Sequence, residues 1–273
     1  MKIGINAWAF PENLTIPQGL KLAKRAEFDC VELNVAESGS LTPDSTEEEV
    51  TFLRSSAENM SLELRSLCSG LLWRNPLTSN DAAVAARGKQ IVRKCLQVCH
   101  WLGADTLLVI PGVVTEDVPY DVAYQRSLAA LKELAGAAEK LSVRIGVENV
   151  WNKFLLSPLE MRDFVDAVAS PMVGVYFDAG NVLVSGYPDH WIKILGQRIF
   201  KVHVKDFHAT IGNITGFANL LEGDLNWRGV ERALRETGYD DVVTAEITGY
   251  KTLPDLGVRH AGESMKRIFK GAS

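Results

Sequence analysis

The chain has 273 residues, of which 47% are apolar, and it carries a formal net charge of −5 at neutral pH. This length and composition suit one large hydrophobic core, so we expect a single domain over residues 1–273. The acidic balance disfavours binding to nucleic acid, which needs a basic surface. No apolar run approaches the length of a membrane span and no charged-then-apolar leader opens the chain, so we expect a cytoplasmic protein without membrane contact.

Eight short apolar segments alternate with helical segments along the chain. The expected strands cover residues 2–5, 29–33, 62–68, 106–110, 144–148, 173–178, 200–206 and 242–246. The expected helices cover residues 16–26, 45–60, 80–102, 120–140, a segment that begins at 157, 189–195, 229–237 and 257–270. This alternation predicts an α/β protein, a (β/α)₈ or TIM barrel. The alternative is an open doubly wound sheet, which would carry a glycine-rich dinucleotide-binding turn after its first strand, and residues 4–9 do not form one.

Four consecutive expected strands carry, at or near their ends, a side chain that can ligate a metal. These are Glu148, Asp178, His203 and Glu246. Along each strand the residue shares a face with small or polar neighbours, while the other face is apolar. In a barrel the first face points inward and the apolar face meets the helices. We therefore expect the four side chains to converge at the carboxyl-terminal mouth, where barrel active sites lie.

Three carboxylates and one imidazole form an oxygen-rich set with a formal charge of −3. Such a set favours Mn²⁺, Mg²⁺ or Co²⁺ over structural zinc, which prefers thiolate and imidazole ligands. We predict one divalent cation as the cofactor and favour Mn²⁺. The competing interpretation is that the four residues form unrelated salt bridges at the barrel mouth.

At these residues the chain resembles the xylose-isomerase-like barrel superfamily of sugar and sugar-phosphate isomerases and epimerases. Its ketose 3-epimerase branch places Glu, Asp, His and Glu on strands five to eight around one divalent cation. The likeness covers nearly the whole chain and includes the motifs at 223–227 (Gly-Asp-Leu-Asn-Trp) and 238–240 (Gly-Tyr-Asp). The resemblance implies that the metal ligands are Glu148, Asp178, His203 and Glu246. It also implies that Glu148 and Glu246 are the catalytic acid and base.

Three positions depart from the pattern of the free-ketose epimerases. Asn181 replaces a histidine three residues after the aspartate, as in the L-ribulose-5-phosphate 3-epimerase branch. Lys205 and Asp206 stand where an arginine is usual after the strand-seven histidine, and Phe154 replaces a second glutamate. These differences concern the substrate rather than the metal. We expect Asn181 and Lys205 to contact the substrate or the groups around the ligands, and a phosphorylated ketose to be preferred.

The chemistry of epimerisation suits the same residues. Removing the proton beside a ketose carbonyl requires a base on one face of the sugar and a Lewis acid that holds the enediolate oxygens. A second acid on the opposite face then returns the proton, and two carboxylates that flank a metal meet both needs. A protonated Lys205 would add stabilisation of the enediolate or bind a phosphate, and the alternative is a structural ion pair with Asp206.

Several residues outside the strands are also candidates. Trp8, Trp73 and Trp151 follow expected strands one, three and five, so they either wall a sugar pocket, which we predict, or pack against the barrel. Glu32 ends the second strand and is interpreted as a carboxylate that supports the ligands or the barrel. The irregular segment 207–227 is long for a connection, which predicts a functional loop or a lid.

Four other functions compete with a ketose or ketose-phosphate 3-epimerase. An aldose–ketose isomerase and a metal-dependent polyol dehydratase would use the same residues and related enolate chemistry. An abasic-site endonuclease on this barrel needs several zinc ions and many histidines, whereas the chain has five histidines and an acidic balance. A non-catalytic sugar-binding barrel is the fourth. The expected partner is a small sugar or sugar phosphate, and the sequence is compatible with a homo-oligomer.

Overall fold

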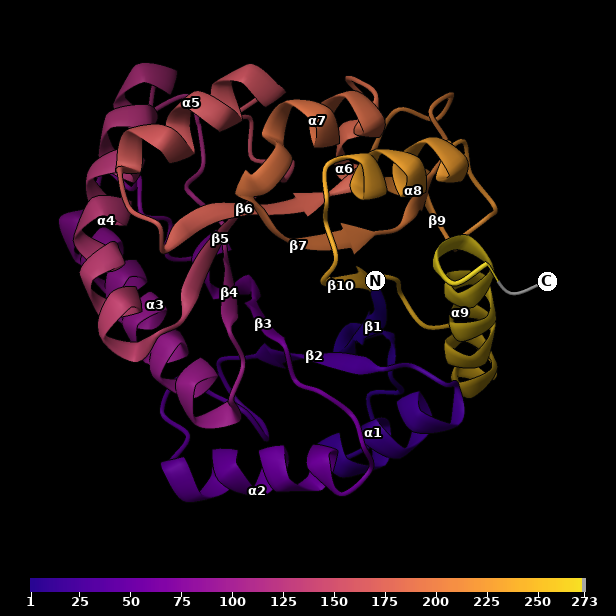
Figure 1. The fold of residues 1–273 in the computed structure, drawn as a ribbon. Helices are drawn as coiled ribbons and strands as arrows, with labels where there is room; N and C mark the ends of the chain where they lie inside the picture. Colours follow the sequence, from indigo (N-terminus) through magenta and orange to yellow (C-terminus); the bar gives the residue numbers. More distant parts are fainter. Residues whose placement is uncertain (272–273) are drawn as a thin grey trace.

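The computed structural model describes residues 1–271 and contains a closed barrel of eight strands (Figure 1). The strands are β1 (Lys2–Asn6), β2 (Cys30–Val35), β3 (Ser66–Ser69), β4 (Thr106–Val109), β5 (Arg144–Glu148), β6 (Val173–Asp178), β7 (Ile199–Val204) and β10 (Val242–Ala245). Their hydrogen-bonded order is β1-β10-β7-β6-β5-β4-β3-β2, and every pairing is parallel. The predicted (β/α)₈ barrel is therefore confirmed.

The helices form a ring outside the strands (Figure 1). They are α1 (Ile16–Arg25), α2 (Glu47–Glu58), α3 (Ala82–Leu102), α4 (Tyr120–Leu141), α5 (Pro158–Val168), α6 (Ala179–Val182), α7 (Pro188–Leu195), α8 (Trp227–Glu236) and α9 (Pro254–Phe269). Polar caps begin several of them: Asp81 accepts hydrogen bonds at the start of α3, and Ser157 does so at α5, where Pro158 takes the first helical position. Within residues 1–271, no helix has the length and apolar character needed to cross a membrane.

The boundaries differ from the prediction mainly in the connections. The third strand begins at Ser66 rather than 62, because only Glu63 of the earlier segment forms a bridge to the barrel. The irregular segment contains a small antiparallel sheet of β8 (Asp206–Phe207) and β9 (Phe217–Ala218), joined through the 3₁₀ helix η4 (Ile214–Gly216). Two further 3₁₀ helices, η1 (Ala7–Ala9) and η2 (Gly70–Trp73), follow β1 and β3. The connections after β1, β3 and β7 are thus locally ordered.

A buried ion cluster closes the amino-terminal end of the barrel. The side chain of Lys201 on β7 is fully buried, and its Nζ lies 2.6 Å from Asp241 and 2.9 Å from Asp105. Arg144 and Arg65 bind the same Asp105 from more exposed positions, at 2.8 and 2.7 Å. Asp105 and Asp241 directly precede β4 and β10, so this cluster marks the end of the barrel opposite the predicted metal site.

Candidate metal centre and active site

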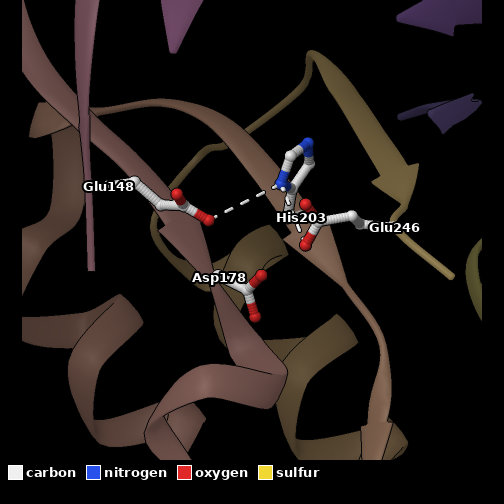
Figure 2. A group of neighbouring side chains, drawn as sticks. All are labelled: Glu148, Asp178, His203 and Glu246. Atoms are coloured by element: carbon white, nitrogen blue, oxygen red, sulfur yellow. Dashed lines mark ion pairs between the residues drawn. The ribbon is translucent and has the colours of Figure 1, made fainter. Parts of the chain in front are cut away.

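The four predicted ligands meet at the carboxyl-terminal mouth of the barrel. Glu148 ends β5, Asp178 ends β6, His203 lies on β7, and Glu246 directly follows β10. One ligand atom from each lies within 4.8 Å of the others, and Figure 2 shows their side chains pointing toward one another. The alternation of side chains along the strands correctly predicted that all four groups come together, although they span almost 100 residues of chain.

His203 supplies the imidazole of this cluster, and one of its two ring nitrogens has no hydrogen-bond partner among the described residues. Its Nδ1 lies 3.9 Å from Glu148 and 3.7 Å from Glu246, too far for a hydrogen bond (dashed lines in Figure 2). Among the described residues, this Nδ1 and Arg65 Nε are the buried side-chain nitrogens without a partner. The other ring nitrogen, Nε2, lies 2.6 Å from Glu32. Glu32 therefore contacts one of the predicted ligands, although it lies within β2 and not at the end of the strand, where the sequence had placed it.

Two asparagines hold Asp178. The Asn149 side chain donates to the Asp178 carbonyl and accepts from its backbone N–H, both at 2.8 Å. The backbone N–H of Asn181 donates to Asp178 Oδ1 at 2.9 Å, because Asp178 caps α6. The Asn181 side chain donates to the Asn149 carbonyl at 3.1 Å and is buried. Asn181 thus contacts groups around a predicted ligand, one of the two places expected for it.

Lys205 does not form an ion pair with Asp206, which was the alternative to a substrate-binding role. Its Nζ donates instead to Asp178 and to Glu246, inside the cluster. Asp206 is adjacent in a strand-like segment, so its side chain points the other way. There its carboxylate accepts hydrogen bonds at 2.9–3.1 Å from the backbone of Phe207, Leu221 and Leu225 and from the Trp227 indole. Asp206 therefore holds the segment 207–227 in place by hydrogen bonds, and this segment forms part of the wall of the site.

The charges of the cluster shift the pKa values of its members in different directions. Burial, with the nearby Glu246 and Asp178 charges, raises the pKa of Glu148 to about 7. Burial also opposes ionisation of Glu246, but the Lys205 and His203 charges outweigh burial and lower its pKa to about 2. Burial likewise opposes protonation of His203, yet the charges of Glu32 and Glu246 raise its pKa well above the ordinary range. In the metal-free protein the imidazole is therefore protonated.

A cavity of about 540 Å³ opens beside the cluster. Its lining includes Lys205 and Glu246 of the cluster, Trp8 from η1, and His208 and Asn219 from the segment around β8 and β9. This segment forms part of the wall, which agrees with the predicted functional loop. Position along the chain alone did not single out His208 or Asn219, because only the folding of the β8–β9 hairpin places them here.

The three predicted tryptophans occupy different surroundings. Trp8 lines the cavity and is 48% exposed, as a sugar-contacting ring would be. Trp73 is 43% exposed at the end of η2 and does not belong to the cavity lining. Trp151 packs against Phe207 and Phe217, and its indole donates to the Asn181 carbonyl at 2.8 Å. Substrate contact stays a prediction for all three, with Trp8 the best placed.

The four side chains fit a divalent cation. Three carboxylates around one imidazole give hard oxygen donors and one nitrogen, a donor set suited to ions such as Mn²⁺ or Mg²⁺. His203 Nδ1 is buried, lacks a hydrogen-bond partner and faces two of the carboxylates. A cation bound there would take the place of the imidazole proton, since metal ligands must be deprotonated.

A closed parallel barrel with acidic and imidazole groups at its carboxyl-terminal mouth defines a TIM barrel with a candidate metal centre. The model of one protein family, described as xylose isomerase-like TIM barrel, matches residues 20–268. The chain belongs to this family.

Individual relatives and solved structures agree with this family. The L-ribulose-5-phosphate 3-epimerase UlaE of Salmonella paratyphi C is 27% identical over 251 residues, which cover 87% of this chain and 84% of UlaE. A solved L-ribulose 3-epimerase superposes with a TM-score of 0.83 at 19% identity, covering 99% of this chain and 95% of that one. The IOLI protein, solved with a bound zinc atom, gives a TM-score of 0.82 at 20% identity over 99% of both chains. The epimerases among these proteins support the prediction of an enzyme.

Proposed function

We propose that the protein is a divalent-metal-dependent epimerase that inverts C3 of a ketose or ketose phosphate. The observation that carries this proposal is the convergence of two glutamates with Asp178 and His203, in which Glu148 and Glu246 approach the common point from different sides (Figure 2). Inversion at one carbon needs one acid–base group on each face of the sugar, and a pair of flanking carboxylates supplies them. The sequence similarity to an L-ribulose-5-phosphate 3-epimerase points to the same reaction.

In this proposal Glu148, Asp178, His203 and Glu246 hold the cation, with Mn²⁺ favoured. A cation held by these residues would supply Lewis-acid chemistry, polarising the substrate carbonyl and stabilising negative charge on the enediolate. Asn149 and the backbone of Asn181 orient Asp178, and Glu32 orients His203. These contacts fix the cluster before the substrate binds, which is the arrangement that electrostatic stabilisation requires.

The two glutamates share the proton transfers. One carboxylate removes the proton from C3, and the electron pair moves toward the C2 carbonyl to give the enediolate. The carboxylic acid of the other glutamate then delivers a proton to C3 from the opposite face, so the configuration is inverted and the sugar gains no net charge. Which glutamate acts as the base depends on the epimer that binds, because the reaction is reversible.

The substrate enters the cavity between Trp8 and the β8–β9 segment. The Lys205 ammonium donates to Asp178 and Glu246 at one wall of this cavity, where it would stabilise an oxyanion of the substrate. Trp8 offers an apolar face to the sugar ring or chain. His208 and Asn219 also line the cavity and would offer polar groups to a terminal phosphate.

The test is an exchange experiment with protein loaded with Mn²⁺. The enzyme is incubated in D₂O with a panel of ketoses and ketose phosphates, and the products are identified by NMR. We expect deuterium at C3 together with the C3 epimer. Deuterium at C1 of the ketose together with an aldose labelled at C2 would instead identify an aldose–ketose isomerase, and loss of water from a polyol ketone would identify a dehydratase. No exchange with any sugar would contradict an enzyme of this class.

A further inference from the structure

We propose that Glu32 is a positioning residue that presents Nδ1 of His203 to the metal. The inference rests on the proposed metal centre but not on the proposed epimerisation. It concerns a residue that lies outside the four-residue cluster and far from it in sequence, since 171 positions separate Glu32 from His203.

The contact between the two residues crosses the interior of the barrel. Glu32 lies on β2 and His203 on β7, and β1 and β10 separate these strands in the barrel. Both side chains are almost completely buried, at 1% and 0% exposure. The short distance of 2.6 Å between Glu32 Oε1 and His203 Nε2 therefore lies in a water-poor environment, where a hydrogen bond to a carboxylate is strong.

The surroundings of Glu32 decide which group is the donor. The Asn6 side chain donates to Glu32 Oε1 at 2.7 Å, and the Tyr176 hydroxyl donates to Oε2. Ser66 in turn contacts the Tyr176 hydroxyl at 3.1 Å. Asn6 and Tyr176 both donate hydrogen bonds to Glu32, so the carboxylate acts as an acceptor and His203 Nε2 carries the hydrogen.

This arrangement leaves Nδ1 as the ring nitrogen that can bind a cation. Nδ1 faces Glu148 and Glu246, and the bond to Glu32 fixes the plane of the ring. A carboxylate that accepts the second N–H of a ligating histidine also makes the ring a better donor. Glu32 thus sets both the direction and the donor strength of His203, although it touches neither the metal nor the substrate.

The first experiment measures the affinity of the metal-free protein for Mn²⁺ by isothermal titration calorimetry. Glu32→Gln keeps the size of the side chain but removes its charge, and we expect binding about 10- to 100-fold weaker, as for other direct partners of metal ligands. The matched control is Glu37→Gln, because Glu37 lies nearby in the chain but is exposed and pairs with Arg74. This variant should bind Mn²⁺ as the wild type does.

The second experiment reports the geometry directly. In ¹⁵N-labelled protein loaded with diamagnetic Zn²⁺, His203 should bind the ion through Nδ1 and retain a protected, downfield N–H signal at Nε2. Glu32→Gln should lose that downfield position. If Glu32→Gln fails to fold, Tyr176→Phe carries the test, with a loss of affinity below about tenfold and an altered Nε2–H signal, because it removes one donor to Glu32.

The role of Glu32 and the existence of the metal centre can be disproved separately. A wild-type protein that binds no divalent cation overturns the metal centre and this inference with it. A wild type that binds one Mn²⁺, with a folded Glu32→Gln variant of unchanged affinity and unchanged N–H signal, overturns the role of Glu32 alone. Coordination of Zn²⁺ through Nε2 would also overturn it.

Discussion

Glu148 and Glu246 lie at similar distances from His203 Nδ1, 3.9 and 3.7 Å, yet their pKa values are shifted in opposite directions. The difference comes from Lys205, which donates to Glu246, whereas within residues 1–271 Glu148 forms no ion pair with a lysine or arginine. Burial therefore raises the pKa of Glu148 to about 7, and the ammonium holds that of Glu246 at about 2 despite burial. Two chemically identical side chains thus differ in their affinity for a proton in the metal-free protein.

The Gln variants of these two glutamates test the acid–base assignment. Glu148→Gln and Glu246→Gln each keep an oxygen for the metal but lose the proton acceptor. We expect each to lower the epimerisation rate by about 10²- to 10⁴-fold, the range for general acid–base groups. One variant should still exchange the C3 proton of one epimer in D₂O without forming product, because only one face is disabled. Near-normal turnover in both variants, with metal content confirmed, would rule out the two-carboxylate mechanism.

Removing the charge of Lys205 should destabilise the metal-free protein. Lys205→Met leaves Asp178 and Glu246 buried without their counter-ion, and breaking a buried ion pair from one side costs about 3–5 kcal/mol. Urea unfolding without metal measures this loss. Saturating Mn²⁺ should stabilise the variant more than the wild type, because the cation replaces the missing charge. Lys193→Met is the control: Lys193 forms a half-exposed pair with Glu236, so its loss should cost less than about 1 kcal/mol.

Metal binding should strengthen as pH rises. The pKa of Glu148 is raised to about 7 and that of His203 is raised well above its ordinary range, so both groups hold protons near neutral pH in the metal-free protein. A cation must displace these protons, and lowering the pH therefore weakens its binding. Calorimetry in buffers of different ionisation enthalpy should show more protons released per Mn²⁺ at pH 6 than at pH 8, because Glu148 is already ionised at pH 8. Binding independent of pH, without proton release, would contradict the roles of both residues.

The substrate prediction concerns the phosphate. We expect a ketose phosphate to have a kcat/KM at least about tenfold above that of the free ketose, since a charge-assisted hydrogen bond contributes about 1.5–3 kcal/mol. Lys205, His208 and Asn219 line the cavity where this group would bind. Steady-state kinetics with each sugar and its phosphate under identical metal loading measure the ratio. A clearly higher kcat/KM for the free sugar would contradict the preference for a phosphorylated ketose. It would not contradict the metal centre.

The sequence predicts the barrel and the four-residue cluster because both depend on local patterns. Strand parity alone places Glu148 and His203 on the inner face, and parallel strands bring their ends to one rim. The partner of Lys205 was not predictable in this way. Adjacent residues such as Lys205 and Asp206 suggest an ion pair, but strand geometry sends them to opposite sides, and the true partners lie 27 and 41 positions away.

Contacts across the barrel interior lie beyond sequence patterns for the same reason. The carboxylate of Glu32 is recognisable as a charged group within a strand, but nothing in the neighbouring sequence indicates that it meets a residue of β7. The wall formed around β8 and β9 likewise depends on the four hydrogen bonds to Asp206, whose donors come from a segment without regular periodicity. Such contacts are decided by how the loops close over the barrel and not by their composition.

The ion cluster of Lys201 at the amino-terminal end has a kinetic consequence for the site at the other end. Because a fully buried ammonium and its aspartates occupy that end, we expect proton exchange between the active site and solvent to take place through the mouth. Glu246 lines the cavity at the mouth and is 14% exposed, whereas Glu148 is 6% exposed and lies outside its lining. A proton taken up by Glu246 is therefore lost to solvent sooner than one taken up by Glu148. Isotope labelling should consequently be unequal in the forward and reverse reactions, with more washout of label in the direction where Glu246 is the base.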